Sequence, residues 1–313
     1  MKLSIVATLY CSAPELPEFY RRCVAAAKEV TDDLEIILVD DGSPDDSLAV
    51  ALSLQASDHR VVVVELARNF GHHKAMMTGL AHSAGDLVFL IDSDLEEPPE
   101  ALTAFHAKLT DGGWDVVYGI QRERRGSPFE RLTGRAFYAI MDALSDRSIP
   151  RDLITARLMR RDYVAALIAH QDRSFQISHL WALTGFRQAA LEVEKLALSP
   201  STYTIRRRLR MAIQHITTTS TRILYFIFYG GLMLSMLAVL LMLFFLGRYF
   251  LHGIEVGGWT SLFISVWFFG GLIVLVLGIL GIYMAAMLEE VKPRPYTHLR
   301  RLHRRQDGEG ATP

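Results

Sequence analysis

Two long stretches without a charged residue constrain the fold of this chain most. They cover residues 223–246 and 259–288. Each exceeds the roughly 20 helical residues needed to cross the hydrocarbon core of a bilayer. A helix inside a soluble protein is rarely so long and so apolar all round. The sequence therefore predicts two transmembrane helices, at about 223–246 and 260–288, joined by a short external loop.

The charges beside these stretches predict the orientation of the chain. The loop between them carries only Arg248 and Glu255. Basic residues gather before the first stretch and after the second: Arg206, Arg207, Arg208, Arg210, Arg222, Lys292, Arg294, Arg300, Arg301, Arg304 and Arg305. Since positive flanks stay in the cytoplasm, we expect a multi-pass protein of the inner (cytoplasmic) membrane, with both termini cytosolic. Cys11 and Cys23 are then expected to be reduced.

The first part of the chain alternates between strand and helix patterns. Apolar runs of strand length lie at 2–10, 35–39, 61–66, 87–91, 115–118, 154–159 and 181–186. Helical periodicity lies at 16–30, 45–56, 72–83, 99–109 and 129–144. Strands that alternate with helices predict an α/β fold with a mostly parallel sheet.

Acidic residues follow two of these strands. Asp40 and Asp41 come after the second strand, and Asp92 and Asp94 come after the fourth. Ligands of parallel sheets bind beyond the carboxyl ends of the strands, and carboxylate oxygens suit Mg²⁺ or Mn²⁺. A single acid-x-acid triplet is more often a solvated loop. Two acidic pairs at one edge of the sheet favour a binding site.

Two arginine-rich segments are further candidates. Arg122, Arg124, Arg125, Arg131 and Arg135 follow the fifth strand. They form either a solvated loop or a clamp for phosphate, because guanidinium pairs bidentately with phosphate oxygens. In 205–217, an apolar stripe flanked by arginines predicts a helix in the membrane interface. Those arginines either anchor the topology or hold an anionic lipid head group.

Other classes of protein are disfavoured. No Gly-x-Gly-x-x-Gly follows the first strand, which argues against a dinucleotide cofactor. The predicted spans hold no ionisable residue, which argues against a transporter. No nucleic-acid partner is expected. His72 and His73 have no partner at metal-binding spacing and are interpreted as residues that begin a helix. Paired glycines in the spans favour close helix packing and a homo-oligomer.

Five features together resemble a known family. In chain order they are Thr8-Leu-Tyr10; Asp40-Asp41-Gly42-Ser43; Arg68-Asn69-Phe70-Gly71; Asp92-Ser-Asp94-Leu-Glu96-Glu97-Pro98-Pro99; and the two apolar stretches closed by Glu290-Val-Lys292-Pro-Arg294-Pro-Tyr296. They resemble the polyprenyl-phosphate glycosyltransferases of family 2, which are relatives of dolichol-phosphate mannose synthase, in their bacterial two-span type. The resemblance covers nearly the whole chain.

The resemblance implies roles for the matching residues. The nucleotide sugar is expected at Thr8, Tyr10, Asp40, Asp41, Asn69 and Asp92. The metal, Mg²⁺ or Mn²⁺, is expected at Asp92, Asp94 and Glu96. The implied catalytic residues are Asp94, Arg122 and Arg131, and the lipid phosphate is expected at Arg135, Arg206 and Arg207. Glu96 departs from the family, which usually has glutamine there.

The resemblance also implies a domain plan and a reaction. A cytosolic GT-A (Rossmann-like) domain is expected at 1–204, a juxtamembrane amphipathic helix at 205–222, two transmembrane helices at 223–290 and a basic cytosolic tail at 291–313. The implied reaction is inverting, metal-dependent transfer of one sugar from a nucleotide sugar to a polyprenyl phosphate such as undecaprenyl phosphate, serving the cell envelope. One alternative is a lipid-linked oligosaccharide or polysaccharide acceptor. Another is an inactive membrane-anchored binding protein.

Overall fold

The chain forms two compact units. The computed structural model describes residues 1–121, 153–170, 172, 175–194, 222–252, 258–292 and 294–305. One unit combines Met1–Gly126, Ile149–Thr202 and Arg294–Pro313, and the other combines Ser127–Ser148 and Tyr203–Pro293. The predicted helix at 129–144 lies outside the described residues, as does the predicted juxtamembrane helix apart from Arg222.

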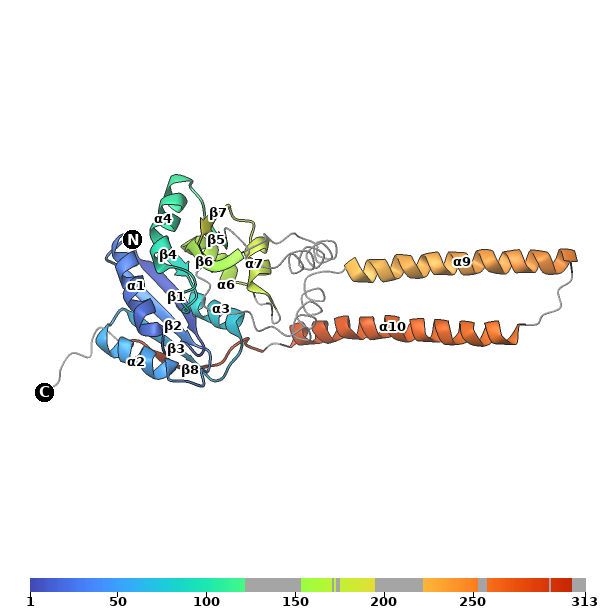
Figure 1. The fold of residues 1–313 in the computed structure, drawn as a ribbon, viewed down its shortest axis with the longest axis horizontal. Helices are drawn as coiled ribbons and strands as arrows, with labels where there is room; N and C mark the ends of the chain where they lie inside the picture. The colour runs from blue at the N-terminus through green and yellow to red at the C-terminus, as the bar shows by residue number, and fades with distance from the viewer. Residues whose placement is uncertain are drawn as a thin grey trace. The chain divides into compact units, whose positions relative to one another are not determined.

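The first unit is built on a mixed, mostly parallel sheet (Figure 1). Its eight strands follow the order β7-β5-β6-β4-β1-β2-β3-β8. Their bounds are β1 Leu3–Leu9, β2 Leu34–Asp40, β3 Val61–Leu66, β4 Leu87–Leu90, β5 Val116–Gln121, β6 Leu153–Arg160, β7 Gln188–Val193 and β8 Leu299–His303. Strands β1 to β4 are mutually parallel, β5 and β7 pair in parallel, and β6 and β8 run antiparallel to their neighbours. The predicted α/β class is confirmed.

Helices cover both faces of this sheet. Their bounds are α1 Leu16–Lys28, α2 Ser47–Ser57, α3 His72–His82, the 3-10 turn η1 Pro99–Ala101, α4 Leu102–Asp111, α6 Arg161–Ile168 and α7 Ile177–Leu183. Helices α1, α2 and α4 pack on one face, and α3, α6 and α7 on the other. Since both faces are covered, strands β1 to β4 are buried along their whole length and read as continuous apolar runs.

Helix α3 lies unusually close to the sheet. Gly79 faces β1 and β2, and a Cβ atom there would lie 2.5 Å from Val6 and 2.8 Å from Val39. Because a larger side chain would push the helix away, Gly79 permits this close packing. The first turn of α3 is thereby held at the carboxyl edge of the central strands.

One predicted strand is wrong. The first half of the segment 181–186 belongs to helix α7, the second half is neither helix nor strand, and the nearby strand is β7. Ile177, Leu180 and Trp181 are buried at helical spacing. The stretch is rich in residues that favour strands, but this preference depends on context, and here packing of one helical face decides.

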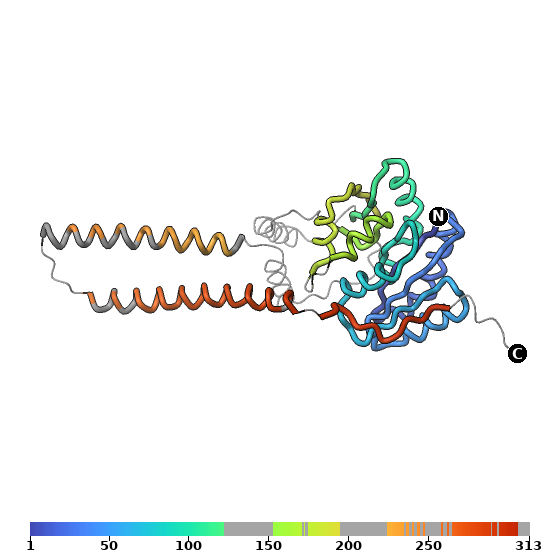
Figure 2. Tube along the Cα trace, turned by 180° about the vertical axis from the view of Figure 1, so that it is seen from behind, coloured from blue at the N-terminus to red at the C-terminus, as the bar shows by residue number. Residues whose placement is uncertain are grey.

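The segment after the second long helix returns to the sheet (Figure 2). The sequence predicts a basic tail at 291–313, and within it β8 pairs antiparallel with β3 at the sheet edge. Glu65 of β3 contacts His303 at 3.1 Å and Arg300 at 3.3 Å. Two basic side chains of the tail are thus paired with one buried acid.

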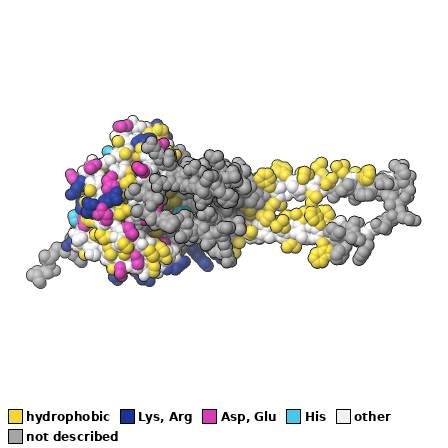
Figure 3. All heavy atoms as spheres, in the orientation of Figure 1, with side chains coloured by type: hydrophobic (Ala, Val, Ile, Leu, Met, Phe, Trp, Pro, Cys, Tyr) yellow, Lys and Arg dark blue, Asp and Glu magenta, His cyan; other side chains and the backbone are white. Residues whose placement is uncertain are grey.

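The second unit contains two long helices, α9 Arg222–His252 and α10 Trp259–Val291. Hydrophobic side chains are exposed along both (Figure 3); Trp267 and Val274 are each 70% exposed. Within the described residues, one segment, Ser265–Leu288, is long and apolar enough to cross a membrane, whereas α9 contains a shorter apolar segment, Leu224–Leu234. The first predicted span therefore stays a prediction.

Candidate functional site

The acids that the sequence places after two strands meet at one edge of the sheet. Strand β1 lies between β2 and β4, with Leu9 opposite Asp40. The backbone N–H of Ile91, directly before Asp92, donates to the Val6 carbonyl 3.1 Å away. Asp40 and Asp41 are each 3% exposed, Asp92 is half-buried and Asp94 is exposed. The predicted convergence at the carboxyl edge is confirmed.

Asp41 connects the loops after β2 and β3. Its carboxylate accepts hydrogen bonds from the backbone N–H groups of Phe70 (2.7 Å) and Gly71 (3.0 Å). Gly42, with φ of +65°, allows the close approach, since a Cβ there would lie 2.6 Å from the backbone of Arg68 and Asn69. The structure shows Asp41 as a group that holds this loop; its predicted contact with a nucleotide sugar stays a prediction.

Burial makes the two acids after β2 electrostatically costly. Burial raises the pKa of Asp40, and hydrogen bonds from Ser43 and Gly42 lower it by less. Burial likewise raises the pKa of Asp41 by more than the hydrogen bonds from Phe70 and Gly71 lower it. Desolvation disfavours a carboxylate, whereas a nearby cation favours it. Clustered acids with raised pKa values are typical of functional sites.

His72, the first residue of α3, joins the site from a third strand end. Its Nδ1 lies 3.0 Å from the Thr8 hydroxyl, and its Nε2 lies 3.2 Å from Asp92 Oδ1. Burial lowers the pKa of His72, but the carboxylates of Asp92, Asp41 and Asp94 outweigh that effect and raise it overall. The interpretation of His72 as a helix-start residue is correct but incomplete. The missed signal is its position at the end of the loop that follows β3, at the same edge of the sheet.

The loop after β4 is fixed on both sides. Ser93 donates its hydroxyl to the Thr8 carbonyl (2.9 Å) and to the Ser12 hydroxyl (3.1 Å). Glu97 is 1% exposed and accepts hydrogen bonds from the backbone N–H groups of Thr155 (2.9 Å) and Ala156 (2.8 Å) on β6. The acidic loop therefore has fixed ends, and Glu97, which the sequence did not single out, holds one of them.

Asp94 projects from the middle of this loop. Its Oδ1 accepts a hydrogen bond from the Glu96 backbone N–H at 3.0 Å. Leu95 between them has a φ of +59°, a left-handed conformation that is uncommon for a residue other than glycine. Such backbone conformations persist where the surroundings enforce them, often at functional sites. Glu96, the predicted third ligand, is half-buried beside Asp94.

The acids could bind a divalent cation only if a substrate supplied some of the metal ligands. Among the described residues, no three His, Cys, Asp or Glu side chains are gathered closely enough to hold a metal ion. The predicted set Asp92, Asp94 and Glu96 is therefore not a preformed three-ligand site. Mg²⁺ is commonly held by one or two carboxylates together with substrate phosphates and water. Asp92 and Asp94 fit that pattern, and the metal role stays a prediction.

The loop after β1 exposes an aromatic ring at the same edge. Tyr10 is 52% exposed, and its backbone N–H donates to the Ser12 hydroxyl at 3.3 Å. The next residue, Cys11, has a φ of +57°. Across the edge, the Arg68 guanidinium lies over the Phe70 ring, 4.1 Å from its centroid, and donates to the Asn69 carbonyl. Binding of a nucleotide by Tyr10 and Asn69 stays a prediction.

The predicted arginines cannot be placed, but another arginine is buried below the edge. Arg122, Arg131, Arg135, Arg206 and Arg207 lie outside the described residues. Arg157 of β6 is fully buried opposite Leu90, with its guanidinium over the Trp181 ring. Within the described part of the chain, its two terminal nitrogens make no hydrogen bond. Burial lowers the pKa of Arg157 to about 9.

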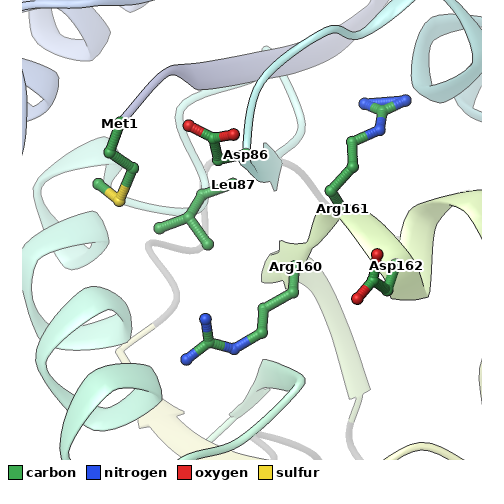
Figure 4. Close-up of a pocket in the computed structure, with 6 residues that line it drawn as sticks. All are labelled: Met1, Asp86, Leu87, Arg160, Arg161 and Asp162. Atoms are coloured by element: carbon green, nitrogen blue, oxygen red, sulfur yellow. The ribbon is translucent and has the colours of Figure 1, made fainter.

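A separate hollow lies at the opposite, amino edge of the sheet (Figure 4). It has a volume of about 290 Å³ and is lined by Met1, Asp86, Leu87, Arg160, Arg161 and Asp162. Arg160 donates to the Trp114 carbonyl and Arg161 to the Ser83 carbonyl. Since both arginines donate hydrogen bonds to nearby backbone carbonyls, we interpret the hollow as a structural feature of the surface that is distinct from the acidic carboxyl edge.

Comparison with known proteins identifies the family. Residues 4–168 match the family model described as "Glycosyl transferase family 2". A Mycobacterium tuberculosis protein described as "Putative glycosyltransferases" is 45% identical over 307 residues, which cover 97% of this chain and 89% of that protein. The uncharacterized glycosyltransferase YkcC of Bacillus subtilis is 29% identical over 94% of this chain and 92% of its own length.

Solved structures of similar proteins share less sequence. Glucosyl-3-phosphoglycerate synthase from Mycobacterium tuberculosis, in complex with Mn²⁺, UDP and phosphoglyceric acid, has a TM-score of 0.49 at 18% identity, covering 69% of this chain and 76% of that one. The mannosyltransferase PcManGT from Pyrobaculum calidifontis, in complex with GDP-Man and Mn²⁺, has a TM-score of 0.48 at 19% identity, covering 68% and 62%.

The family match extends over more than half of the chain, and the mycobacterial relative extends it to nearly the whole length. With the acidic loops at the carboxyl edge of its α/β sheet, the chain belongs to glycosyltransferase family 2 and is a sugar-transferring enzyme.

Proposed function

We propose that this enzyme transfers a single sugar from a nucleotide sugar to a polyprenyl phosphate, undecaprenyl phosphate in the first instance, at the cytoplasmic face of the inner membrane. The observation that supports this most is that one chain carries both an acidic strand-edge site and α10, a helix apolar enough to cross a membrane. A soluble acceptor would not require such a helix. A lipid acceptor brings its phosphate to the membrane surface.

The proposed chemistry needs positioning more than proton transfer. The acceptor is a phosphate monoester whose second pKa is about 6, so its oxygens are already largely anionic at neutral pH. Asp92 and Asp94 would hold Mg²⁺ or Mn²⁺, which supplies Lewis-acid stabilisation of the departing diphosphate. Attack by the lipid phosphate oxygen on the anomeric carbon breaks the bond to the nucleotide in one displacement, and this inverts the configuration.

The remaining predicted residues have defined places in this proposal. Tyr10, Asp40 and Asn69 line the edge where the nucleotide would bind. Arg122 and Arg131 would bring donor and acceptor phosphates together, because guanidinium groups neutralise two anions held close to each other. Arg135, Arg206 and Arg207 would meet the lipid phosphate. Membrane lipids and further copies of the chain are the other proposed partners.

The test uses the full chain in membranes. Each of a panel of radiolabelled nucleotide sugars is added with undecaprenyl phosphate and Mg²⁺ or Mn²⁺, and the lipid product is analysed. We expect one donor to label the lipid, chelation to abolish labelling, and Asp94→Asn to abolish it too. Asp111→Asn is the matched control, since Asp111 is an exposed acid at the end of α4.

Two outcomes would contradict the proposal in different ways. Full activity of Asp94→Asn, with folding intact, would remove the metal assignment. A donor that labels an oligosaccharide or polysaccharide while none labels the lipid would replace the proposed acceptor. Metal-dependent transfer of any kind would exclude the inactive binding protein.

A further inference from the structure

We propose that His72 is a positioning residue of this site, which holds the Asp92 carboxylate and the Thr8 hydroxyl in one fixed arrangement before donor and cation bind. The inference rests on the proposed metal-dependent transfer. It concerns a residue that the sequence interpreted only as the start of a helix, and it assigns to the imidazole a contribution to metal affinity.

The backbone fixes where the imidazole can lie. Helix α3 is held close to β1 and β2 by the packing of Gly79. The two residues before His72, Phe70 and Gly71, donate their backbone N–H groups to the buried Asp41 carboxylate. The start of α3 is therefore held from two sides, and the position of His72 follows from contacts that do not involve its own side chain.

Both ring nitrogens face groups of the site. Nδ1 lies 3.0 Å from Thr8 Oγ1, and Nε2 lies 3.2 Å from Asp92 Oδ1. A proton on Nε2 suits both contacts, since Nδ1 can then accept from the Thr8 hydroxyl and the proton lies on the nitrogen that is within ion-pair distance of Asp92 Oδ1. The contact to Asp92 falls on Oδ1.

These contacts close a ring that joins the loops after β1 and β4. His72 connects the Thr8 side chain to Asp92, Ser93 follows Asp92 in the chain, and the Ser93 hydroxyl donates to the Thr8 carbonyl at 2.9 Å. Thr8 itself is 7% exposed. Because Asp92 is bound into this ring through its side chain and through its neighbour, removal of the imidazole removes one of the contacts that orient the carboxylate.

The ring predicts a specific effect on metal binding. Partners that orient metal-binding groups typically contribute 10–100-fold in metal affinity. A residue that merely filled space would instead change stability and leave the affinity of folded molecules unaltered. Metal affinity and melting temperature measured together therefore separate the two roles.

The experiment compares His72→Ala and His72→Gln in the full chain in detergent. Free Mn²⁺ is followed by electron paramagnetic resonance, with Mn²⁺ alone and with UDP or GDP added. We expect Mn²⁺ binding to weaken about 10–100-fold in His72→Ala. Most of it should return in His72→Gln, whose amide nitrogen has the same reach as Nε2. His82→Ala is the control, because His82 lies at the other end of α3 and bonds the Thr78 carbonyl of its own helix.

The outcomes separate this inference from the proposed function. Wild-type binding of Mn²⁺ with unchanged binding in His72→Ala would overturn the role of His72 and leave the function standing. Equal weakening in both variants would show that a donor at the Nε2 position does not carry the effect, and it would also overturn the role of His72. No Mn²⁺ binding by the wild-type chain, with or without nucleotide, would overturn both proposals.

Discussion

The two edges of the sheet bury acids to a similar degree and treat them in opposite ways. At the amino edge, Glu35 is 5% exposed; burial pushes its pKa up, but Lys2, Ser4 and the Ala84 N–H outweigh this and lower it. At the carboxyl edge, Asp40 and Asp41 are 3% exposed, and burial outweighs their hydrogen bonds and raises their pKa values. The fold thus stabilises the charged form of the acid at the amino edge and disfavours the charged form of the acids at the carboxyl edge.

The difference lies in where the positive charge comes from. Lys2 Nζ lies 2.8 Å from Glu35, and Arg60 lies 2.8 Å from the buried Asp58. In the described part of the chain, Asp40 and Asp41 have no lysine or arginine within ion-pair distance. A protein that neutralised every acid internally would be more stable but would offer no site for a cation or a donor. The carboxyl edge is therefore the part of the fold where we propose that a cation and a donor bind.

Asp92→Asn tests the carboxyl edge and carries the largest expected effect. The substitution keeps the size of the side chain and removes its charge. We expect sugar transfer to fall about a hundredfold or more, as for loss of one group that stabilises transition-state charge, while the melting temperature without metal is held or rises. Initial rates and thermal unfolding of the full chain measure this. A transfer rate within threefold of wild type would contradict the proposal that the carboxyl edge is the functional edge.

Glu35→Gln is the converse change at the amino edge. The amide still accepts from Ser4 and Ala84 but leaves Lys2 without its partner. We expect a loss of roughly 1–3 kcal/mol of stability, the cost typical of a disrupted charged hydrogen bond, with an unchanged transfer rate per folded molecule. Glu29→Gln, at the exposed end of α1, is the control for thermal unfolding. Reduced transfer by folded Glu35→Gln would show that the edges are coupled.

Gly42→Ala and Gly113→Ala form a matched pair with a smaller expected difference. Both glycines have positive φ, +65° and +56°, so both variants carry the left-handed cost of about 1–2 kcal/mol. A Cβ at Gly42 would also lie 2.6 Å from the backbone of Arg68 and Asn69, whereas at Gly113 nothing lies within 4 Å. We expect Gly42→Ala to lose roughly 1 kcal/mol more and to raise KM for the donor, while Gly113→Ala keeps its KM. Equal KM values would separate this loop from donor binding.

The sequence predicted the parallel core well because its signals are local. Strand β3 is found at the predicted 61–66, and β1, β2 and β4 differ by a residue or two, since strands covered on both faces read as continuous apolar runs. The convergence of acids followed from topology alone, as residues after parallel strands share an edge. Neither inference needed a contact between particular side chains.

What the sequence missed depends on contacts between distant residues. His72 and Thr8 are 64 positions apart, and Glu97 and Thr155 are 58 apart. Nothing near Glu97 distinguishes it from Glu96, yet one is buried against β6 and the other is half-buried beside Asp94. Strand β8 was hidden in a basic tail because its neighbours in sequence are charged, and only pairing with β3 reveals it.

The smallest expected effect is a difference in pH dependence between Asp58→Asn and Asp40→Asn. Burial raises the pKa of Asp58, but Arg60 and Tyr20 outweigh it and hold the pKa well below its usual range. A lowered folded-state pKa stabilises the protein at neutral pH, and this contribution is lost as pH falls through the folded value. Asp58→Asn should therefore be less stable than wild type near neutrality. This difference in stability should disappear only at the acid end of the pH range.

For Asp40 the sign is reversed. Its pKa is raised in the folded state, so the native protein binds the proton more tightly than the unfolded chain, and stability increases as pH falls through the folded value. Asp40→Asn, whose amide oxygen still accepts from the Ser43 N–H, should be more stable than wild type near neutrality, and that gap should close at a higher pH than the gap for Asp58. Melting temperatures between about pH 7 and pH 4 measure both gaps. Gaps of the same sign would mean that the two edges do not differ in how they hold charge, because only opposite pKa shifts give opposite signs.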